Sequence, residues 1–398
     1  MKTSVAVFFG GRSTEHEISV ISAIQTINAI DKSKYDVYPV YITKQGKWLW
    51  GNALTNIEGY RTPERLETLC EEVYMKSEYG DRNLYRAHPK GFLKKKDVVV
   101  TLDVVFPVLH GSNGEDGVFQ GVLDNIGIPY VGCNVLASAV GMDKIFMKMV
   151  LQSCGIPVVP FIWFTDKEWF SNEEETIAAI ANATGYPVIV KPANLGSSVG
   201  IGAAFNEQEL KAKISDACKY SSRIIVEKLI EDMQEINCSV LGDCDDCLPS
   251  VLEEPIKTGA LLSYEDKYMG GTKGSEGMAA SSKRIPAELS EDITETIRNM
   301  AVDTFKVLGC NGVSRVDVMI DKKIQKIYVN EINTIPGSLS YYLWEFTGVG
   351  FTELTDRLIS LALKRAREIQ SKTTTYSLNI FNAKSFGGAK SIKGGIKN

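Results

Sequence analysis

Two short apolar segments in the last third of the chain carry polar side chains at alternate positions. They read Ser314-Arg315-Val316-Asp317-Val318 and Val329-Asn330-Glu331-Ile332-Asn333. In a β-strand, residues two apart point to the same face. If the two segments form a hairpin centred on residue 324, Asp317 lies opposite Glu331 and Arg315 lies opposite Asn333. We therefore expect four hydrophilic side chains to converge on one face of this hairpin.

These side chains suit the binding of a metal ion and a phosphate group. Asp317, Glu331 and Asn333 offer hard oxygen ligands of the kind that Mg²⁺ prefers, usually completed by phosphate oxygens and water. The guanidinium of Arg315 suits a transferring phosphoryl group. The alternative is a surface hairpin with a ladder of salt bridges, but such ladders rarely place Asn and Asp among Val and Ile. The pattern favours the metal site.

A second candidate is the lysine that ends the apolar run Val188–Pro192. Lys191 is followed by a loop over 194–202 that is rich in glycine and includes Ser197 and Ser198. Free backbone N–H groups and hydroxyls in such a loop can fold over phosphates, and the lysine can meet their charge. The loop is not a Walker A motif, because no lysine follows its glycines. Gly-Ser loops are also common simple turns, so this motif alone leaves both interpretations open.

Weaker signals lie at the ends of other predicted elements. Glu227 and Lys228 end a buried strand whose backbone groups could face an adenine edge, and Glu235 downstream is available for ribose hydroxyls. Lys144 begins a predicted helix. Taken singly, these residues are only suggestive.

Two N-terminal loops also contain candidates. Residues 10–17 lie between a strand and a helix, where α/β proteins place ligand contacts. Glu15 or Glu17 could pair with a substrate ammonium group, although Ser13 or Thr14 with Glu17 also fits a helix-capping box. A second loop begins at His110, which the spacing leaves open as either a structural histidine or a site residue; the two loops read Gly10-Gly-Arg-Ser-Thr-Glu-His-Glu17 and His110-Gly-Ser-Asn-Gly-Glu-Asp-Gly117.

The composition limits the classes of protein. The chain has 398 residues, of which 44% are apolar and 23% charged, and a net charge of −5. These are globular values, and the length suggests two or three domains. The negative charge gives no general attraction to nucleic acid or anionic membranes, so we expect neither as a partner. No stretch of about 20 apolar residues occurs, and Val5–Phe9 is too short for a signal sequence, so we expect a soluble, cytoplasmic protein.

The eight cysteines are scattered along the chain, which favours reduced thiols. Cys244 and Cys247 have metal-ligand or redox spacing. A structural zinc site would need a second pair, and a redox site would need a helix N-terminus. We interpret this segment as the tip of a hairpin.

The elements that position these residues follow from hydrophobic periodicity. A strand at 5–9, a helix at 19–30 and a strand at 37–42 form the βαβ opening of a doubly wound parallel layer. Further along, we expect strands at 98–108, 158–164, 187–191, 199–204, 223–227, 235–241, 248–256, 313–320 and 325–332, and helices at 118–126, 143–154, 172–184, 207–218, 290–308 and 352–370.

We infer an α/β fold of three lobes and a tail. They are an N-terminal α/β substrate-binding domain over 1–140 with an insertion at 51–96, a central α+β lobe over 141–230, a C-terminal α+β lobe with an antiparallel sheet and the metal site over 231–371, and a flexible tail over 372–398.

In their order along the chain, the motifs resemble those of the D-alanine–D-alanine ligase family, which has the ATP-grasp fold. The resemblance runs from Gly10 to Gly337 and also takes in Met142-Asp143-Lys144, Tyr264-Glu265-Asp266-Lys267-Tyr268 and Glu331-Ile332-Asn333-Thr334-Ile335-Pro336-Gly337. Each motif alone is a modest signal, whereas the ordered set is specific.

The resemblance implies a role for each matching residue. Glu15 holds the ammonium group of the first D-amino acid, with Ser197 and Tyr268 completing a hydrogen-bonded triad and His110 nearby. Arg315 and the backbone N–H of Gly337 stabilise the oxyanion. The nucleotide contacts are Lys144, Lys191, Ser198, Glu227, Lys228, Glu235 and Lys267, and the ligands for two Mg²⁺ ions, which Mn²⁺ can replace, are Asp317, Glu331 and Asn333.

The resemblance also implies the reaction. The γ-phosphoryl group of ATP passes to the carboxylate of D-alanine and makes an acyl phosphate. The amine or hydroxyl of a second D-amino or D-hydroxy acid then attacks its carbonyl and phosphate leaves, in the synthesis of cell-wall peptidoglycan precursors. The segment 264–282 is expected to cover the site and exclude water. A homodimer is the implied assembly.

The sequence departs from the family after Gly337. The family continues with a hydrophobic residue and Thr-Ser-His-Ser, whose last serine helps to bind the carboxylate of the second substrate. Here the segment reads Ser338-Leu339-Ser340-Tyr341-Tyr342-Leu343-Trp344. Tyr342 takes the aligned place, with Ser338 and Ser340 close by. The acceptor therefore stays open among D-Ala, D-Ser, D-lactate and a less usual amine; another ATP-grasp carboxylate–amine ligase and a non-catalytic nucleotide-binding regulator are the alternatives.

Overall fold

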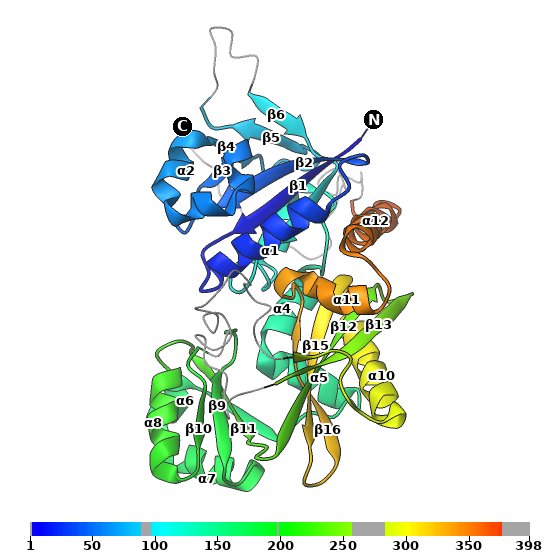
Figure 1. Cartoon of the computed structure of the whole chain (residues 1–398). Helices are drawn as coiled ribbons and strands as arrows, with labels where there is room; N and C mark the ends of the chain where they lie inside the picture. The colour runs from blue at the N-terminus through cyan, green and yellow to red at the C-terminus, as the bar shows by residue number, and fades with distance from the viewer. Residues whose placement is uncertain (1, 89–96, 197–198, 257–282, 376–398) are drawn as a thin grey trace, which may run out of the picture.

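The computed structural model describes residues 2–88, 97–196, 199–256 and 283–375. In these ranges the chain forms three β-sheets with helices packed against them, as Figure 1 shows. No helix within them is long and apolar enough to cross a membrane.

The first sheet has seven strands in the order β6-β5-β4-β3-β2-β1-β7. The predicted βαβ opening is confirmed, because β1 pairs in parallel with both β2 and β7. The elements are β1 (Thr3–Gly10), α1 (His16–Ala29), β2 (Tyr35–Ile42), β3 (Trp48–Trp50), η1 (Asn52–Thr55), η2 (Ile57–Arg61), α2 (Pro63–Leu69), β4 (Glu71–Met75), β5 (Asn83–Arg86), β6 (Val98–Thr101), β7 (Val104–Val108) and α3 (Val118–Ile126).

Within the region 51–96, β4 and β5 extend the sheet with antiparallel pairing. The interpretation of this region as an insertion stays a prediction. One detail of the sheet differs from the sequence prediction. The segment 98–108, predicted as one strand, is two strands at opposite edges of the sheet. The break falls at Asp103, whose carboxylate accepts a hydrogen bond of 2.8 Å from the backbone N–H of Ser4. A polar anchor therefore interrupts an otherwise apolar run.

The second sheet has four antiparallel strands in the order β10-β9-β11-β8. Its helices bury Trp169, Ile180 and Leu210 in a small core of their own. The elements are β8 (Phe161–Thr165), α6 (Asp166–Ser171), α7 (Glu173–Ala183), β9 (Val188–Pro192), β10 (Gly202–Ala204), α8 (Glu207–Ala217) and β11 (Arg223–Lys228).

The third sheet is antiparallel, in the order β14-β13-β12-β15-β16. The turn that joins β12 to β13 contains Cys244, so the predicted hairpin tip is confirmed, and all eight cysteines are free thiols. The elements are β12 (Met233–Gly242), β13 (Cys247–Pro255), β14 (Lys283–Arg284), α10 (Glu291–Val307), β15 (Gly312–Asp321), β16 (Lys326–Asn333), η3 (Gly337–Ser340), α11 (Tyr341–Phe346) and α12 (Phe351–Gln370).

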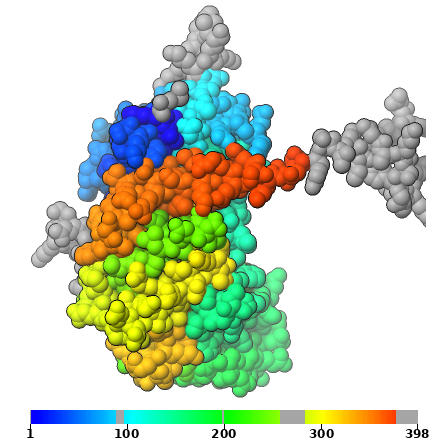
Figure 2. All heavy atoms as spheres, turned by 90° about the vertical axis from the view of Figure 1, so that its right-hand side faces the viewer, coloured from blue at the N-terminus to red at the C-terminus, as the bar shows by residue number. Residues whose placement is uncertain are grey.

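Several helices connect the sheets. The helices α4 (Val135–Met142) and α5 (Lys144–Ser153) contribute Ala137, Met147 and Leu151 to the core of the third sheet. The helix α12 packs between the first and third sheets, where Leu354 and Leu358 share a core with Val5 of β1 and Val313 of β15. In Figure 2 this orange-to-red segment crosses between the blue first sheet and the yellow part of the third. The lobe boundaries near 140 and 230 stay a prediction.

Candidate active site

The hairpin of β15 and β16 has the predicted register. Arg315 lies opposite Asn333, and Asp317 lies opposite Glu331. The pairing shifts immediately after Asp317, so that Asn330 is an extra residue in β16. The apolar residues between these positions are buried in the core of the third sheet. The four predicted polar side chains therefore come together on one face.

Within this group, Asp317 is the centre of the hydrogen bonding. Its carboxylate accepts hydrogen bonds of 2.6 and 2.8 Å from the guanidinium of Arg315 and one of 3.0 Å from the amide of Asn333. Asp317 is 3% exposed. Burial raises the pKa of its carboxyl group, and the positive charge of Arg315 opposes that shift.

Two lysines from other elements approach the same hairpin. The ammonium group of Lys144 at the start of α5 donates to the carbonyl of Leu195 at 2.8 Å and lies 3.6 Å from Glu331 Oε2. Lys191 on β9 donates to Asn330 Oδ1 at 3.2 Å. The glycine-rich loop and the hairpin, which are far apart in the sequence, are therefore neighbours.

The other predicted nucleotide contacts lie around Lys191. It donates a 2.8 Å hydrogen bond to Glu227 Oε2, and Glu227 Oε1 lies 3.3 Å from the ammonium group of Lys148. Lys228 donates instead to the carbonyl of Tyr186 at 3.4 Å. Glu235 lies on β12, near enough to Asp317 to raise the pKa of that carboxyl group, although less than burial does. The sequence analysis missed Lys148, because a lysine in an amphipathic helix is normally exposed.

Glu15 lies between two of the predicted loops. A Cβ atom added to Gly111 would lie 2.7 Å from Glu15 Oε2, and one added to Gly196 would lie 3.4 Å from the same carboxylate. Glu17 forms an exposed ion pair of 2.5 Å with Lys44. The Glu15 carboxylate therefore lies next to Gly111 and Gly196, whereas Glu17 is on the surface; the role of Glu15 at the site stays a prediction. The capping alternative is wrong, because α1 has no side-chain cap.

His110 is buried and connects to the loop that follows Gly337. Its Nε2 forms a hydrogen bond of 2.9 Å with Ser22 Oγ, which also accepts the N–H of Ser338 at 2.9 Å. Burial lowers the pKa of His110, against the raising effect of Glu15, which favours the neutral ring. Ser22 on α1 was not predicted, because a serine within a helix gives no signal of its contacts.

The carboxylate of Glu115 connects the loop that begins at His110 with the segment that leads to Gly337. Its Oε2 accepts the N–H of Gly111 at 2.8 Å, and its Oε1 accepts the N–H of Ile335 at 2.9 Å. Burial, with the nearby charge of Glu15, raises the pKa of Glu115 to about 8. Glu115 lies within the 110–117 motif and was not itself predicted as a site residue. Its two hydrogen bonds fix the N-terminal loop against the loop that leads to Gly337.

The loop after Gly337 has an unusual backbone. Ser338, Leu339 and Ser340 all have positive φ, at 50°, 54° and 49°. Residues other than glycine adopt this conformation at a cost, and such strain is concentrated at functional sites. Ser338 and Ser340 are buried, and Gly337 begins the short helix η3 in which they lie.

Tyr342 is part of a polar cluster on the third sheet, which we call the acceptor cluster and which consists of Tyr342, Glu253, Lys283 and Asn237. The hydroxyl of Tyr342 donates to Glu253 Oε2 at 3.0 Å, and Asn237 Nδ2 donates to the same oxygen at 3.3 Å. Lys283 lies 3.6 Å from Glu253 Oε1 and 3.5 Å from the centre of the Tyr342 ring. Burial and the charge of Glu253 raise the pKa of Tyr342.

The strand register connects this cluster to the predicted metal ligands. Glu253 on β13 lies opposite Asn237 on β12, which lies opposite Asp317 on β15, and Asp317 lies opposite Glu331 on β16. A row of polar residues therefore crosses four strands of the sheet. The sequence analysis found only the half of the row that the β15–β16 hairpin carries.

Four predicted site residues lie outside the described ranges. They are Ser197, Ser198, Lys267 and Tyr268. The same holds for the predicted cover at 264–282.

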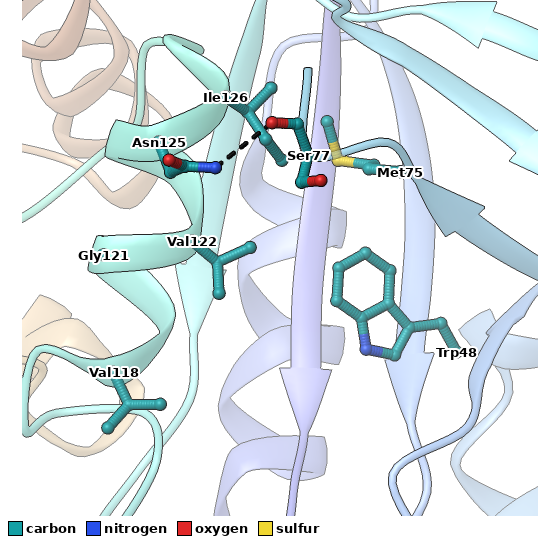
Figure 3. A pocket seen from close by; sticks show the side chains of 8 residues that line it. All are labelled: Trp48, Met75, Ser77, Val118, Gly121, Val122, Asn125 and Ile126. Atoms are coloured by element: carbon teal, nitrogen blue, oxygen red, sulfur yellow. Dashed lines mark hydrogen bonds between the residues drawn. The ribbon is translucent and has the colours of Figure 1, made fainter. Parts of the chain in front are cut away.

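Two hollows lie on the surface of the described chain. One, of about 370 Å³, lies between α3 and the first sheet, where Val118 and Val122 face Trp48 and Met75 in Figure 3. The residues that line it include no ionisable side chain. The other hollow has a volume of about 320 Å³. Its lining includes Asp143, which precedes Lys144 in the sequence, together with Asp116, Asn194 and Arg223.

Comparison with known sequences gives the same family over nearly the whole chain. The family model described as "D-ala D-ala ligase N-terminus" matches residues 4–133, and that described as "D-ala D-ala ligase C-terminus" matches residues 150–360. The D-alanine–D-alanine ligase of Acetivibrio thermocellus is 40% identical over 92% of this chain and 96% of its own length. That of Caldicellulosiruptor bescii is 41% identical over 94% and 99%.

Solved structures agree with this match. The D-alanine–D-alanine ligase from Coxiella burnetii has a TM-score of 0.76 and 30% identity, covering 93% of this chain and 96% of that one. The VanG D-Ala:D-Ser ligase from Enterococcus faecalis has a TM-score of 0.76 and 31% identity, covering 91% and 100%. The chain therefore belongs to the D-alanine–D-alanine ligase family and has its ATP-grasp fold.

Proposed function

We propose that this protein joins the carboxylate of one D-alanine to the amine of another, at the expense of ATP, and so makes the D-alanyl-D-alanine used in peptidoglycan precursors. The observation that carries the proposal is the convergence of Lys144 and Lys191 on the hairpin of Asp317 and Glu331. A nucleoside triphosphate with bound metal ions is held by cations that meet its phosphates and by carboxylates that bind the metal ions, and both kinds of group are present here.

The residues fit Mg²⁺ as the metal. Asp317 and Glu331 provide carboxylate oxygens and Asn333 provides an amide oxygen, which are hard ligands. Within the described ranges no cluster of three or more Asp, Glu, His or Cys side chains is placed to hold a metal. This agrees with a site that phosphate oxygens and water complete. When bound, the metal would offset the charge of the phosphates; we propose two Mg²⁺ ions, which Mn²⁺ can replace.

Other residues of the chain are proposed to bind the first D-alanine, to position the loop that leads to Gly337 and to stabilise the oxyanion. Glu15 binds the ammonium group of the first D-alanine, because its carboxylate lies where the Gly111 and Gly196 segments meet. The hydrogen bonds of Glu115 hold the loop that leads to Gly337 against this donor site. We propose that the N–H of Gly337 and the guanidinium of Arg315 stabilise the oxyanion that forms when the acceptor attacks the activated carboxylate.

The nucleotide would lie between the second and third sheets. Lys144 and Lys191 are proposed to bind its phosphates and Glu227 and Glu235 its adenosine, with Lys228 contributing through its backbone. Ser198 and Lys267 are proposed for the phosphates, and Ser197 and Tyr268 for the triad with Glu15. We also propose a cytoplasmic homodimer with the lobes 1–140, 141–230 and 231–371, which light scattering and limited proteolysis can test.

A second candidate is a ligase whose acceptor is not D-alanine. The acceptor cluster favours it, because Tyr342 stands where the family has a carboxylate-binding serine and its hydroxyl is already committed to Glu253. Glu253, 4% exposed, presents a carboxylate, which accepts hydrogen bonds and repels anions. An acceptor with a hydroxyl or amino group on its side chain suits this cluster, and one structural neighbour carries D-Ser in its name.

One experiment separates these functions. The protein is incubated with ATP, Mg²⁺ and D-Ala, alone and with D-Ser, D-lactate and other D-amino acids, and phosphate release and coupled product are measured. Turnover with D-Ala alone supports the first proposal. Turnover that requires a different acceptor selects the second. Nucleotide binding without turnover for any acceptor would leave only the non-catalytic regulator.

A further inference from the structure

Lys148 is a fully buried lysine whose role neither the motifs nor the proposed reaction explains. It lies on α5, the helix that contributes Met147 and Leu151 to the apolar core, and its side chain is 0% exposed. Burying an ammonium group costs several kcal/mol unless it is paired. Within the described residues its ammonium group makes no hydrogen bond, and its one ion pair is with Glu227 at 3.3 Å.

Glu227 is shared by two lysines. Its Oε2 accepts a hydrogen bond of 2.8 Å from Lys191, and its Oε1 faces Lys148. The carboxylate is 1% exposed, so removing both cations would leave an uncompensated buried charge. Burial raises the pKa of Glu227, but Lys148 and Lys191 together more than offset this and lower it.

The two lysines differ in what else they can reach. Lys191 also donates to Asn330, beside the proposed metal ligand Glu331, so its ammonium group reaches the hairpin where the phosphates are proposed to bind. Lys148 has no exposed surface and no second partner among the described residues. When Lys191 turns to phosphate, Lys148 is the cation that stays with Glu227.

We propose that Lys148 is a positioning residue for the nucleotide. It is the permanent counter-ion of Glu227, keeps that carboxylate ionised as a hydrogen-bond acceptor for the amino group of the nucleobase, and leaves Lys191 available to the phosphates. This inference rests on the proposed use of ATP, but it concerns binding and base selectivity rather than ligation.

The charges around Lys148 support this assignment. Burial lowers the pKa of Lys148 to about 8, and the effect of Glu227 opposes this more than that of Glu331 does. Among the described residues, the charge of Lys191 contributes to lowering it. Lys148 is therefore held in its charged form chiefly by the carboxylate that it is proposed to position.

The test replaces Lys148 by methionine, which keeps the length and removes the charge. The full-length protein is titrated calorimetrically with a non-hydrolysable ATP analogue and Mg²⁺. We expect Lys148→Met to weaken binding of the analogue about tenfold or more, because the buried carboxylate of Glu227 loses that partner. In the ligation assay KM for ATP rises by a similar factor while kcat changes less, and the preference for ATP over GTP falls. Met147→Leu, an equally buried change on the same helix, is the control and leaves all three unchanged.

A second variant keeps the inference testable if Lys148→Met does not fold. Glu227→Gln needs no counter-ion, so adding Lys148→Met to it should cause little further loss of affinity. Full additivity of the two changes, or wild-type affinity and base preference in Lys148→Met, would overturn the inference. Failure of the wild-type protein to ligate D-Ala would instead count against the proposed function, since nucleotide binding is measured separately.

Discussion

Arg315 and Asp317, two residues apart on β15, bind each other through two hydrogen bonds of 2.6 and 2.8 Å. The pair balances the buried negative charge of Asp317 with the partly buried positive charge of Arg315, so the carboxylate is not left uncompensated. Both belong to the proposed chemistry, Asp317 as a metal ligand and Arg315 as the cation at the oxyanion. The hairpin therefore holds its reactive groups in a compensated arrangement.

Replacing Asp317 by asparagine tests the metal assignment. The amide still accepts a hydrogen bond from Arg315, so the far-ultraviolet circular dichroism should not change. It has no charge to offer a metal ion, so we expect turnover to fall about 100-fold or more. The measurement is phosphate release as a function of Mg²⁺ concentration. Asp321→Asn, at the far end of the same strand, is the matched control, and full activity of Asp317→Asn would refute the assignment.

Glu15 and Glu17 provide a matched pair for the donor site. Glu15→Gln removes the charge that we propose binds the ammonium group of D-alanine, so kcat/KM for D-alanine should fall about 10- to 100-fold. KM for ATP should stay the same. Glu17→Gln disrupts only an exposed ion pair with Lys44 and should have little effect. Equal losses in both variants would show that Glu15 has no special role.

Tyr342 tests the acceptor side. Tyr342→Phe keeps the ring beneath Lys283 but removes the hydrogen bond to Glu253, so the ranking of acceptors in the substrate panel should change while KM for ATP does not. The loss of one buried hydrogen bond predicts a change of about tenfold for the preferred acceptor. Tyr341→Phe is the control, because Tyr341 stacks on Phe351. An unchanged ranking in Tyr342→Phe would remove the acceptor cluster from substrate selection.

The raised pKa of Glu115 predicts how the free energy of unfolding depends on pH. Because burial raises its pKa from 4.5 to about 8, the folded protein keeps a proton that the unfolded chain releases within this range. The contribution of Glu115 to the free energy of unfolding is therefore greatest below the unfolded value and decreases as the pH rises through about 8. Urea unfolding at several pH values measures it.

The variant Glu115→Gln should flatten this slope, since an amide does not titrate. It should also lower stability by about 1–3 kcal/mol, because Gly111 or Ile335 then loses its hydrogen-bond acceptor. Glu174→Gln, at the exposed start of α7, should keep the wild-type slope. A slope in Glu115→Gln equal to that of the wild type would show that another group dominates.

Substitution of Gly10 tests how tightly the fold packs at the start of the loop that carries Glu15. Its φ is +89°, and an added Cβ would lie 2.3 Å from the carbonyl oxygen of Ile42. We expect Gly10→Ala to lower the free energy of unfolding by about 2–4 kcal/mol, from backbone strain and a backbone clash. Gly132, at φ +93° with no atom within 4 Å, separates the two effects, since Gly132→Ala should cost only about 1 kcal/mol. Similar losses in both variants would exclude the clash.

The sequence allowed the local parts of the site to be predicted. The alternation of polar and apolar residues in β15 and β16 was enough for the register of Asp317 with Glu331, because a hairpin is a local structure whose pairing follows from its turn. Helices with strong periodicity, such as α3 and α10, were also predicted closely. The positions of Lys144 and Lys191 beside the hairpin came only from resemblance to a family.

The residues that were missed depend on long-range contacts. Ser22, Glu115 and Glu253 each bind groups that are far away in the sequence, and nothing in their immediate neighbours indicates this. Lys148 was missed because burial of a charged residue depends on a partner in another element. The split between β6 and β7 was missed because one apolar run supplies both edges of a sheet, with Asp103 between them.

The shared core of the first and last elements affects how the protein is made. Val5 and Val7 of β1 leave the ribosome early, whereas Leu354 and Leu358 of α12, which belong to the same apolar core, are still untranslated. At ordinary rates of synthesis the interval is roughly 20–70 seconds. During that time the core that the first sheet shares with α12 is incomplete. We therefore expect chaperones and proteases to recognise the nascent chain until α12 emerges.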